Sequence, residues 1–250
     1  MNNLIILTGC SGNLGSSMLN ELLKTYYVLG ISRKCKDLKI DPKFQDKFIP
    51  LVSDFSIQKV EDIFIQIKKL IIEKNLFLRG LVNNAIFNIP KSPLEIDPIS
   101  CAKSSEGLFA YHVRLSIMLK PLFVPPSSII NITSMYGKVS PDPSIYDESN
   151  LMNPMLYGSF KAALIQSSKY LSSIFGPSDI RVNSVSYGPF PSEKVKTNNP
   201  DFIYELTNRT HLKRIGNPTE SVGVIKFLLS ENSSYITGTD IAVDGGWTAW

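Results

Sequence analysis

The stretch N-L-I-I-L-T-G-C-S-G-N-L-G at positions 3–15 decides the fold class of this chain. An apolar run of the kind found in buried strands leads into Gly9, Gly12 and Gly15, and a segment with helical periodicity follows. Glycines between a strand and a helix allow a tight turn and a close approach of backbone amides to a pyrophosphate, and the helix N-terminus adds partial positive charge. Residues 8–15 are therefore predicted to hold a dinucleotide.

Apolar runs continue to alternate with helical periodicity along the rest of the chain. Continuous Val-, Ile- and Leu-rich runs separated by helices are typical of a parallel sheet that is covered on both faces. We therefore expect a single α/β domain over residues 1–250, with a Rossmann-like, doubly wound parallel sheet. The expected strands are 3–8, 26–32, 48–53, 80–85, 128–134, 180–186 and 239–244, and the expected helices are 14–25, 60–71, 100–119, 154–175 and 219–230.

The composition excludes several classes of function. The chain has 250 residues and a net charge of +4, and it lacks the blocks of like charge that bind nucleic acids. It has no apolar stretch of about 18 residues that could span a membrane, and its start lacks the basic region of a signal peptide. Three scattered cysteines and two histidines form no metal-ligand cluster. We expect a cytoplasmic protein that acts on a small-molecule substrate and binds no metal, nucleic acid or membrane.

Tyr157 and Lys161 are spaced to share one helix face, and Ser134 ends an apolar run upstream of them. A phenol has a pKa of about 10, and a nearby ammonium group favours the phenolate and lowers that pKa. A serine hydroxyl at the end of a strand can hold a substrate oxygen beside the tyrosine. Ser134, Tyr157 and Lys161 are therefore candidate catalytic residues that give a proton to a carbonyl or take one from an alcohol.

The residue type at the end of the second expected strand determines whether NAD or NADP is preferred. An acidic residue there would hold the ribose hydroxyls of NAD, whereas an arginine accommodates the 2′-phosphate of NADP. The chain has Ser32, Arg33 and Lys34, and no acidic residue before Asp37. Because Arg33 could form a bidentate pair with the phosphate, NADP(H) is predicted. NAD(H) is the alternative if Arg33 and Lys34 form only a solvated turn.

Further motifs follow in an order that resembles the short-chain dehydrogenase/reductase family along nearly the entire chain. They are Asp54, N-N-A (83–85), Ser134, the Tyr157/Lys161 pair, V-N-S-V-S-Y-G-P-F (182–190), and R-I-G-N-P with I-T-G-T-D-I-A-V-D-G-G-W (214–247). The resemblance implies hydride transfer to or from a nicotinamide ring. It places Asp54 near the adenine, Asn83 near the cofactor ribose, and Lys161 on the nicotinamide ribose. The residues expected to contact the cofactor are Gly9, Ser11, Gly12, Asn13, Leu14, Arg33, Asp54, Phe55, Asn83, Ala85, Tyr157, Lys161 and Gly188.

A closer resemblance concerns S-M-Y-G-K-V-S-P-D-P-S-I-Y (134–146) and the ending D-G-G-W-T-A-W (244–250). Both look like those of the flagellin-modification oxidoreductases, which serve surface-sugar pathways. Residues 137–156 are expected as an inserted loop over the active site, which either shapes the pocket or is structural decoration. Residues 190–215 are expected as a mobile loop that forms a substrate lid. The lid's basic excess suits a phosphorylated or nucleotide-activated sugar, unless this face is only solvated.

The chain departs from the family pattern at four points. Asn13 stands where most single-domain members have a glycine, and Ile86 replaces the glycine after N-N-A. The helix asparagine of the family's proton relay has no match in residues 101–120. His112 lies nearby and could help to hold the water of this relay, but it is expected to be a helix-surface or interface histidine. Tyr187 replaces the usual proline before Gly188.

These observations predict an NADP(H)-dependent oxidoreductase that interconverts a carbonyl and a hydroxyl, on a sugar or sugar-derived metabolite. The alternatives are a nucleotide-sugar epimerase or dehydratase, and a dinucleotide-binding protein with little catalysis. The resemblance also implies a homodimer or homotetramer, for which the helix 154–175 and the C-terminal W-T-A-W offer contact surfaces.

Overall fold

The computed structural model describes residues 2–87, 96–146 and 153–250. Seven strands form one sheet in the order β3-β2-β1-β4-β5-β6-β7, and every neighbouring pair is parallel. Their bounds are β1 Asn3–Thr8, β2 Tyr27–Ser32, β3 Phe48–Val52, β4 Phe77–Asn83, β5 Phe123–Ser134, β6 Ile180–Tyr187 and β7 Asp240–Val243. The strand order reverses its direction between β1 and β4. In doubly wound sheets, ligands bind at this reversal, beyond the carboxyl ends of the two strands. The predicted fold class is confirmed.

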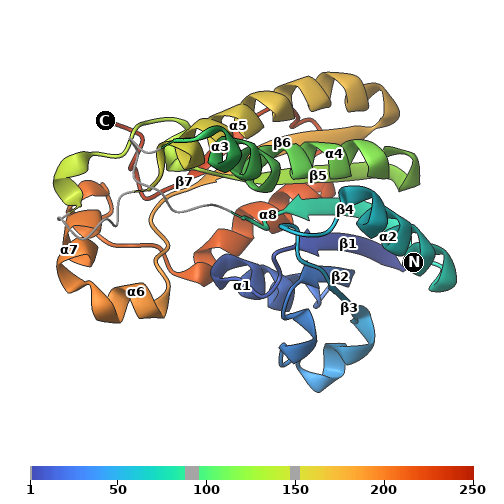
Figure 1. Cartoon of the computed structure of the whole chain (residues 1–250). Helices are drawn as coiled ribbons and strands as arrows, with labels where there is room; N and C mark the ends of the chain where they lie inside the picture. Colours follow the sequence, from blue (N-terminus) through green and yellow to red (C-terminus); the bar gives the residue numbers. More distant parts are fainter. Residues whose placement is uncertain (1, 88–95, 147–152) are drawn as a thin grey trace.

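Helices cover both faces of the sheet (Figure 1). Their bounds are α1 Asn13–Leu22, α2 Val60–Glu73, α3 Pro98–Ser105, α4 Tyr111–Leu119, α5 Met155–Phe175, α6 Glu193–Asn198, α7 Pro200–Arg209 and α8 Val222–Leu229. The helices α6 and α7 lie at the same end of the molecule as the C-terminus (Figure 1). No helix within the described ranges has the length and apolar character needed to cross a bilayer.

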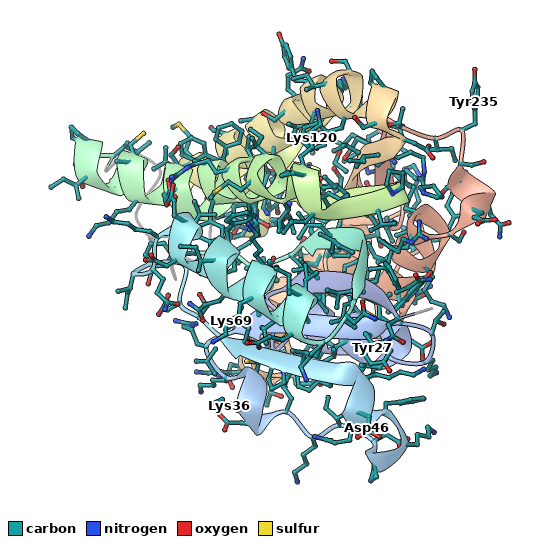
Figure 2. All side chains as sticks on the ribbon, turned by 90° about the vertical axis from the view of Figure 1, so that its right-hand side faces the viewer. Tyr27, Lys36, Asp46, Lys69, Lys120 and Tyr235 are labelled. Carbon is teal, nitrogen blue, oxygen red and sulfur yellow. The ribbon has the colours of Figure 1, made fainter. Side chains whose placement is uncertain are left out.

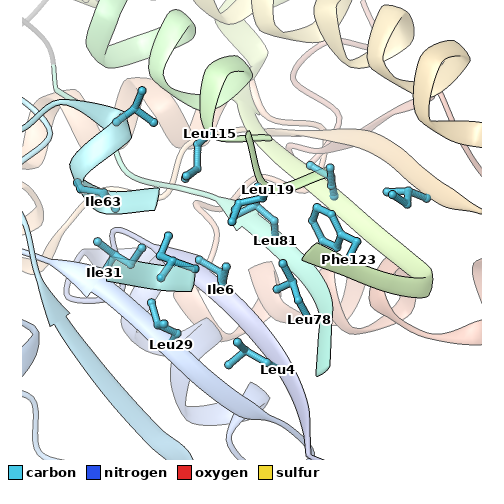
Figure 3. Close-up of a cluster of buried hydrophobic side chains, with 14 of the residues drawn as sticks. Leu4, Ile6, Leu29, Ile31, Ile63, Leu78, Leu81, Leu115, Leu119 and Phe123 are labelled. Atoms are coloured by element: carbon cyan, nitrogen blue, oxygen red, sulfur yellow. The ribbon is translucent and has the colours of Figure 1, made fainter. Parts of the chain in front are cut away.

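The central strands are apolar throughout because both of their faces are covered. Successive side chains of β1 point to opposite faces, so Leu4 and Ile6 join the core beneath α2, α4 and α5, whereas Ile5 and Leu7 join the core beneath α1 and α8. Figure 3 shows the first of these cores, in which side chains of β1, β2 and β4 meet those of α2 and α4. Burial of each Leu or Ile side chain contributes roughly 1.5–3 kcal/mol to folding.

Side chains fill the space between the sheet and its helices, and polar groups gather at the periphery (Figure 2). Tyr235 stands out from the surface in this view, and its side chain is fully exposed. It lies in the turn between α8 and β7, at the opposite end of β7 from the site described below.

A third, smaller core joins segments that are distant in the sequence. It contains Met135, Tyr136, Ile145, Leu206 and Trp247. These residues come from the turn after β5, the following 3-10 turn, α7 and the C-terminal segment. The core fixes α7 against the turn that follows Ser134.

Two segments differ from their predicted form. The predicted helix 100–119 contains a π-helical turn at Glu106–Ala110 between α3 and α4. The predicted loop 190–215 instead contains α6 and α7. Pro200 occupies the first turn of α7, where its missing N–H needs no partner, and the apolar side chains of Phe202, Ile203 and Leu206 face the third core.

Candidate active site

A groove of about 780 Å³ opens at the carboxyl ends of the strands. Loops after β1, β2, β3, β4, β5 and β6 line it, and α5 contributes its N-terminal half. Thirteen of the predicted site residues line this one groove. They are Gly9, Ser11, Gly12, Asn13, Leu14, Arg33, Asp54, Phe55, Ala85, Ser134, Tyr157, Lys161 and Gly188.

The turn after β1 is shaped by contacts that only glycine permits. Gly9 has a φ of +68°, and a Cβ atom there would lie 2.8 Å from the Cα of Ala85. A Cβ atom on Gly15 would lie 2.1 Å from the carbonyl oxygen of Gly9. Both positions must therefore lack a side chain if the turn is to stay close to the end of β4.

Thr8 and Asn84 hold this turn against the end of β4. The hydroxyl of Thr8 accepts hydrogen bonds from the backbone amides of Asn84 and Ala85, each at 2.9 Å. The side-chain amide of Asn84 donates in return to the carbonyl groups of Thr8 and Gly9. Asn84 also lines the groove. This role of Asn84 was not predicted, although Asn84 directly follows the predicted residue Asn83 at the end of β4.

The helix α1 begins at the groove without a side-chain cap. Its N-cap residue is Gly12, and its first turn contains no acidic residue. The first backbone amides of a helix lack partners within the helix and carry partial positive charge. The start of α1 therefore fits a pyrophosphate, and the residues present fit a dinucleotide in this groove.

Arg33 and Asp54 lie at the end of the groove formed by β2 and β3. The Arg33 side chain is exposed beside Ser32, which also lines the groove. The Asp54 carboxylate accepts hydrogen bonds from the amide and the hydroxyl of Ser56. These bonds hold the pKa of Asp54 below its usual range, and the positive charge of Arg33 lowers it slightly further.

Asn83 is the predicted site residue that does not line the groove. Its side chain is fully buried and donates to the Oδ1 atom of Asn131 at 2.8 Å and to the Ser116 hydroxyl at 3.1 Å. Asn131 donates in turn to the Ser168 hydroxyl on α5. The Asn83 side chain thus points into the sheet–helix interior, and the predicted place of Asn83 near the cofactor ribose stays a prediction. Asn84 occupies the groove instead.

Tyr157 and Lys161 lie one turn apart on α5, and Ser134 faces them from the end of β5. Burial raises the pKa of Tyr157, although a hydrogen bond from Ser134 opposes this. The pKa of Tyr157 is thus raised, whereas the sequence predicted that Lys161 would lower it. The reason is that the half-buried phenol is partly removed from water, and the Lys161 ammonium is directed to the Ile132 carbonyl oxygen at 2.8 Å.

Lys161 is itself perturbed by its surroundings. Its side chain is 2% exposed, and burial lowers its pKa to about 8. Within the described part of the chain, the carbonyl oxygen of Ile132 is its hydrogen-bond acceptor. A buried cation with one acceptor favours any added negative charge or hydrogen-bond acceptor nearby. The pair can therefore support a phenolate when substrate and cofactor fill the groove.

His112 is fully buried, so its expected place on a helix surface or at an interface is wrong. The π-helical turn at Glu106–Ala110 precedes it and changes the face that α4 presents to the sheet. Burial, and secondarily the charge of Lys161, lowers the pKa of His112 to about 3. Its imidazole is therefore neutral at all ordinary pH values.

The segment after Ser134 is joined to α7 by polar and aromatic contacts. The hydroxyls of Tyr136 and Tyr146 are hydrogen-bonded, and the Tyr146 ring lies 5.3 Å from that of Phe202. Arg209 forms an ion pair with Asp142. Part of the predicted inserted loop 137–156 is thus fastened to the predicted lid, while residues 147–152 of that loop lie outside the described ranges.

The positive charges of the predicted lid are largely paired. Lys196 pairs with Glu193, Arg209 with Asp142, and Arg214 with Glu220. Asp142 and Glu220 lie outside residues 190–215, so counting charges within the segment overstated its basic character. The exposed Lys194 and Lys213 make no ion pair with a described residue, so the free positive charge of this segment is reduced to these two side chains.

Three aromatic residues outside the predicted set also line the groove, namely Phe87, Tyr187 and Phe190. The Tyr187 hydroxyl donates to the carbonyl of Ser221, and its ring packs edge-on against that of Phe190. The side-chain amide of Asn13 donates to the carbonyl oxygen of Phe190 at 3.0 Å. The residue that replaces the usual glycine therefore connects the cofactor turn to the root of the lid. Phe190 could have been found from its place directly after the Y-G-P motif.

Comparison with known proteins adds three findings from sequence. The family model described as "Enoyl-(Acyl carrier protein) reductase" matches residues 66–248. The L-xylulose reductase of Caenorhabditis elegans is 30% identical, over 98% of this chain and 95% of its own length. The isoepoxydon dehydrogenase patN of Aspergillus clavatus is 38% identical over 47% of this chain, and the match spans only 50% of that relative.

Solved structures agree with the fold. A short-chain dehydrogenase from Leptospira borgpetersenii, solved with bound NAD⁺, is 26% identical to this chain. The two superpose with a TM-score of 0.81, over 99% of this chain and 93% of that chain.

Proposed function

Because this chain belongs to the short-chain dehydrogenase/reductase family, we propose that it is an NADP(H)-dependent oxidoreductase that interconverts a carbonyl and a hydroxyl. The observation that carries the proposal is the convergence of Ser134, Tyr157 and Lys161 on the groove that also contains the glycine turn. A protein that only binds a dinucleotide has no need for a buried lysine beside a half-buried phenol. This argues against the alternative of a binding protein with little catalysis.

Each of the three side chains has a distinct role in the proposed reaction. The nicotinamide, when bound, supplies or accepts the hydride. In the reducing direction, Tyr157 gives its phenolic proton to the substrate oxygen. Ser134 donates a hydrogen bond to the same oxygen and orients the carbonyl, while the Lys161 ammonium stabilises the phenolate that remains. In the oxidising direction, the phenolate accepts the proton of the alcohol.

Arg33 supports the choice of NADP(H) over NAD(H). It lies at the end of β2, it is exposed beside the groove, and no carboxylate stands between Ser32 and Lys36. A guanidinium group recognises a phosphate through paired, charge-assisted hydrogen bonds. The Leptospira structure holds NAD⁺, so the two dinucleotides must be compared directly.

The proposed substrate is a sugar or a sugar-derived metabolite. The full-length relative from Caenorhabditis elegans is named for the reduction of L-xylulose, an uncharged ketose. The paired charges of the lid also suit an uncharged substrate better than a phosphorylated or nucleotide-activated one. A role in surface-sugar or flagellin modification is a narrower form of the proposal and rests on the resemblance of residues 134–146 and 244–250.

The quaternary structure is part of the proposal. Apolar side chains of Ile117 on α4, and of Tyr170 and Ile174 on α5, are more than half exposed. Of the C-terminal tryptophans, Trp247 is buried and Trp250 is exposed. A homodimer or homotetramer would cover the exposed surfaces, and light scattering of the purified protein tests this.

A screen for NADPH oxidation tests the proposed reaction. The purified protein is mixed with NADPH and with L-xylulose, other ketoses, α-dicarbonyls and cyclic ketones, and the loss of nicotinamide absorbance is followed. We expect turnover with at least one neutral hydroxylated carbonyl compound. The formation of an epimerised or dehydrated nucleotide sugar, with no net change in nicotinamide absorbance, would instead support the epimerase or dehydratase alternative.

A further inference from the structure

Asn13 joins two parts of the molecule that are distant in the sequence. It is the first residue of α1, directly after the N-cap Gly12, and it lines the groove. Its side-chain amide donates a hydrogen bond of 3.0 Å to the carbonyl oxygen of Phe190, at the start of the predicted lid. The position that holds a glycine in most single-domain members of the family therefore carries, in this chain, a donor to the lid.

Phe190 is a junction between the two ends of the lid segment (residues 190–215). Its ring packs edge-on against Tyr187, with the centroids 5.4 Å apart. The same ring lies against Gly216, where a Cβ atom would be 2.4 Å from it. The backbone amide of Gly216 donates to the carbonyl of Pro189 at 2.9 Å. A contact that fixes Phe190 thus limits the movement of both ends of the lid segment.

The helices of the lid segment have few buried contacts of their own. No residue of α6 is buried, and Leu206 is the buried residue of α7. Segments with little buried apolar surface open at low free-energy cost. The order of α6 and α7 should therefore depend strongly on how firmly the root at Phe190 is held.

The backbone of Asn13 belongs to the part of the turn that fits the dinucleotide. The first amides of α1 lack partners within the helix, and no side chain caps them. A pyrophosphate at these amides would immobilise the start of the helix. Because the side chain that reaches Phe190 comes from the same residue, immobilising this backbone also fixes the donor of the hydrogen bond to the lid.

We propose that Asn13 couples dinucleotide binding to the lid segment. The bound dinucleotide fixes the start of α1, and the Asn13 side chain then holds Phe190, so that α6 and α7 become ordered before the substrate binds. This inference deepens the proposed function and rests on it, because the lid segment acts on the substrate of that reaction. The Asn13 side chain touches no reacting atom, and Asn13 is a positioning residue.

Hydrogen–deuterium exchange of the full chain, with and without saturating NADPH, measures the order of the lid segment without a substrate. In wild type, NADPH should slow exchange in α6 and α7 by about fivefold, in keeping with the net strength of one hydrogen bond. Asn13→Ala removes the donor and should reduce this slowing to less than about twofold. Asn13→Gly introduces the residue that is usual in the family and should behave in the same way. Fluorescence titration sets the NADPH concentration that saturates each variant.

Asn199→Ala is the matched control. The Asn199 side chain donates to the carbonyl of Val195 at 3.4 Å, so this bond lies entirely within the lid segment. Its loss can speed exchange in the free and the bound protein alike, but the ratio between the two states should equal that of wild type. A merely structural role of Asn13 would likewise leave this ratio unchanged.

Two results would overturn the inference. One is an equal slowing by NADPH in Asn13→Ala and wild type, and the other is no slowing in wild type. If turnover is found, Asn13→Ala should raise KM for the carbonyl compound about fivefold and leave kcat within about twofold, because the substrate must then order the lid itself. A lack of turnover with every carbonyl compound, together with slowing that depends on Asn13, would count against the proposed function alone.

Discussion

The Nζ atom of Lys161 lies 5.8 Å from the centre of the Tyr157 ring, one helical turn away on α5. The ammonium is therefore near the phenol but is bonded to the backbone of β5. This arrangement fixes the lysine in place independently of the phenol. A positive charge at this distance can stabilise the Tyr157 phenolate electrostatically without a direct hydrogen bond to it.

The pH dependence of the reducing reaction should report the ionisation of Lys161. Burial lowers the pKa of this lysine to about 8, so the ammonium is present below this pH and is lost as the pH rises through it. We expect kcat/KM for carbonyl reduction to be nearly constant between pH 6 and about 8, and to fall above this range. Lys161→Met should be poorly active at every pH. A wild-type profile that keeps rising to pH 10 would contradict this assignment.

Arg33→Ser should change the preference between the two dinucleotides. The loss of a charge-assisted contact to the 2′-phosphate is expected to weaken NADPH binding by roughly 10- to 100-fold and to leave NADH binding almost unchanged. Fluorescence titration with both dinucleotides measures this. Lys34→Ser is the matched control, because Lys34 is adjacent and exposed but is outside the groove lining. Equal losses in the two variants would mean that general positive charge, rather than Arg33, recognises the cofactor.

Gly15→Ala should abolish dinucleotide binding. The added methyl group would lie 2.1 Å from the carbonyl oxygen of Gly9 and 2.9 Å from the side chain of Asn84, so the turn must open away from β4. Gly223→Ala is the control, because a methyl group there meets no atom within 4 Å. That control should be more stable than wild type by roughly 0.5–1 kcal/mol, as expected for alanine in a helix. Normal NADPH binding by Gly15→Ala would show that the turn does not hold the cofactor.

His112 should make the protein less stable in mild acid. Its pKa in the folded state is about 3, below the ordinary value of 6.5, so the unfolded chain binds the proton more readily. The contribution to stability is complete above about pH 6.5 and falls by about 1.4 kcal/mol per pH unit as the pH drops toward 3. Urea unfolding at pH 7 and pH 5 should therefore show a smaller acid loss in His112→Asn than in wild type. Identical losses would indicate that His112 titrates normally.

The sequence predicted the sheet and most of the site because both depend on local patterns. Apolar runs and glycine spacing are enough to locate the strands and the first turn, and a spacing of four residues along α5 places Tyr157 and Lys161 together. The side chains of Asn83 and Asn84 were harder to assign. Neighbouring residues at the end of a strand point to opposite faces of the sheet. The amino-acid sequence alone does not say which of the two side chains borders the groove.

Two other features depend on geometry that a regular pattern does not contain. The π-helical turn at Glu106–Ala110 shifts the helical register, so His112 faces the interior although a continuous helix allowed a surface position. The lid charges are paired partly by Asp142 and Glu220, which belong to other segments. Both features arise from tertiary contacts between distant parts of the chain.

Turnover by Tyr157→Phe, compared with wild type in the same NADPH-linked assay, tests the central claim most directly. The substitution removes one hydroxyl and keeps the ring, so NADPH should bind within about twofold of wild type, while kcat falls by roughly 10²- to 10⁴-fold. Tyr170→Phe, at an exposed position of the same helix, should retain full activity. Substantial turnover by Tyr157→Phe would contradict the assignment of the phenol as the proton donor.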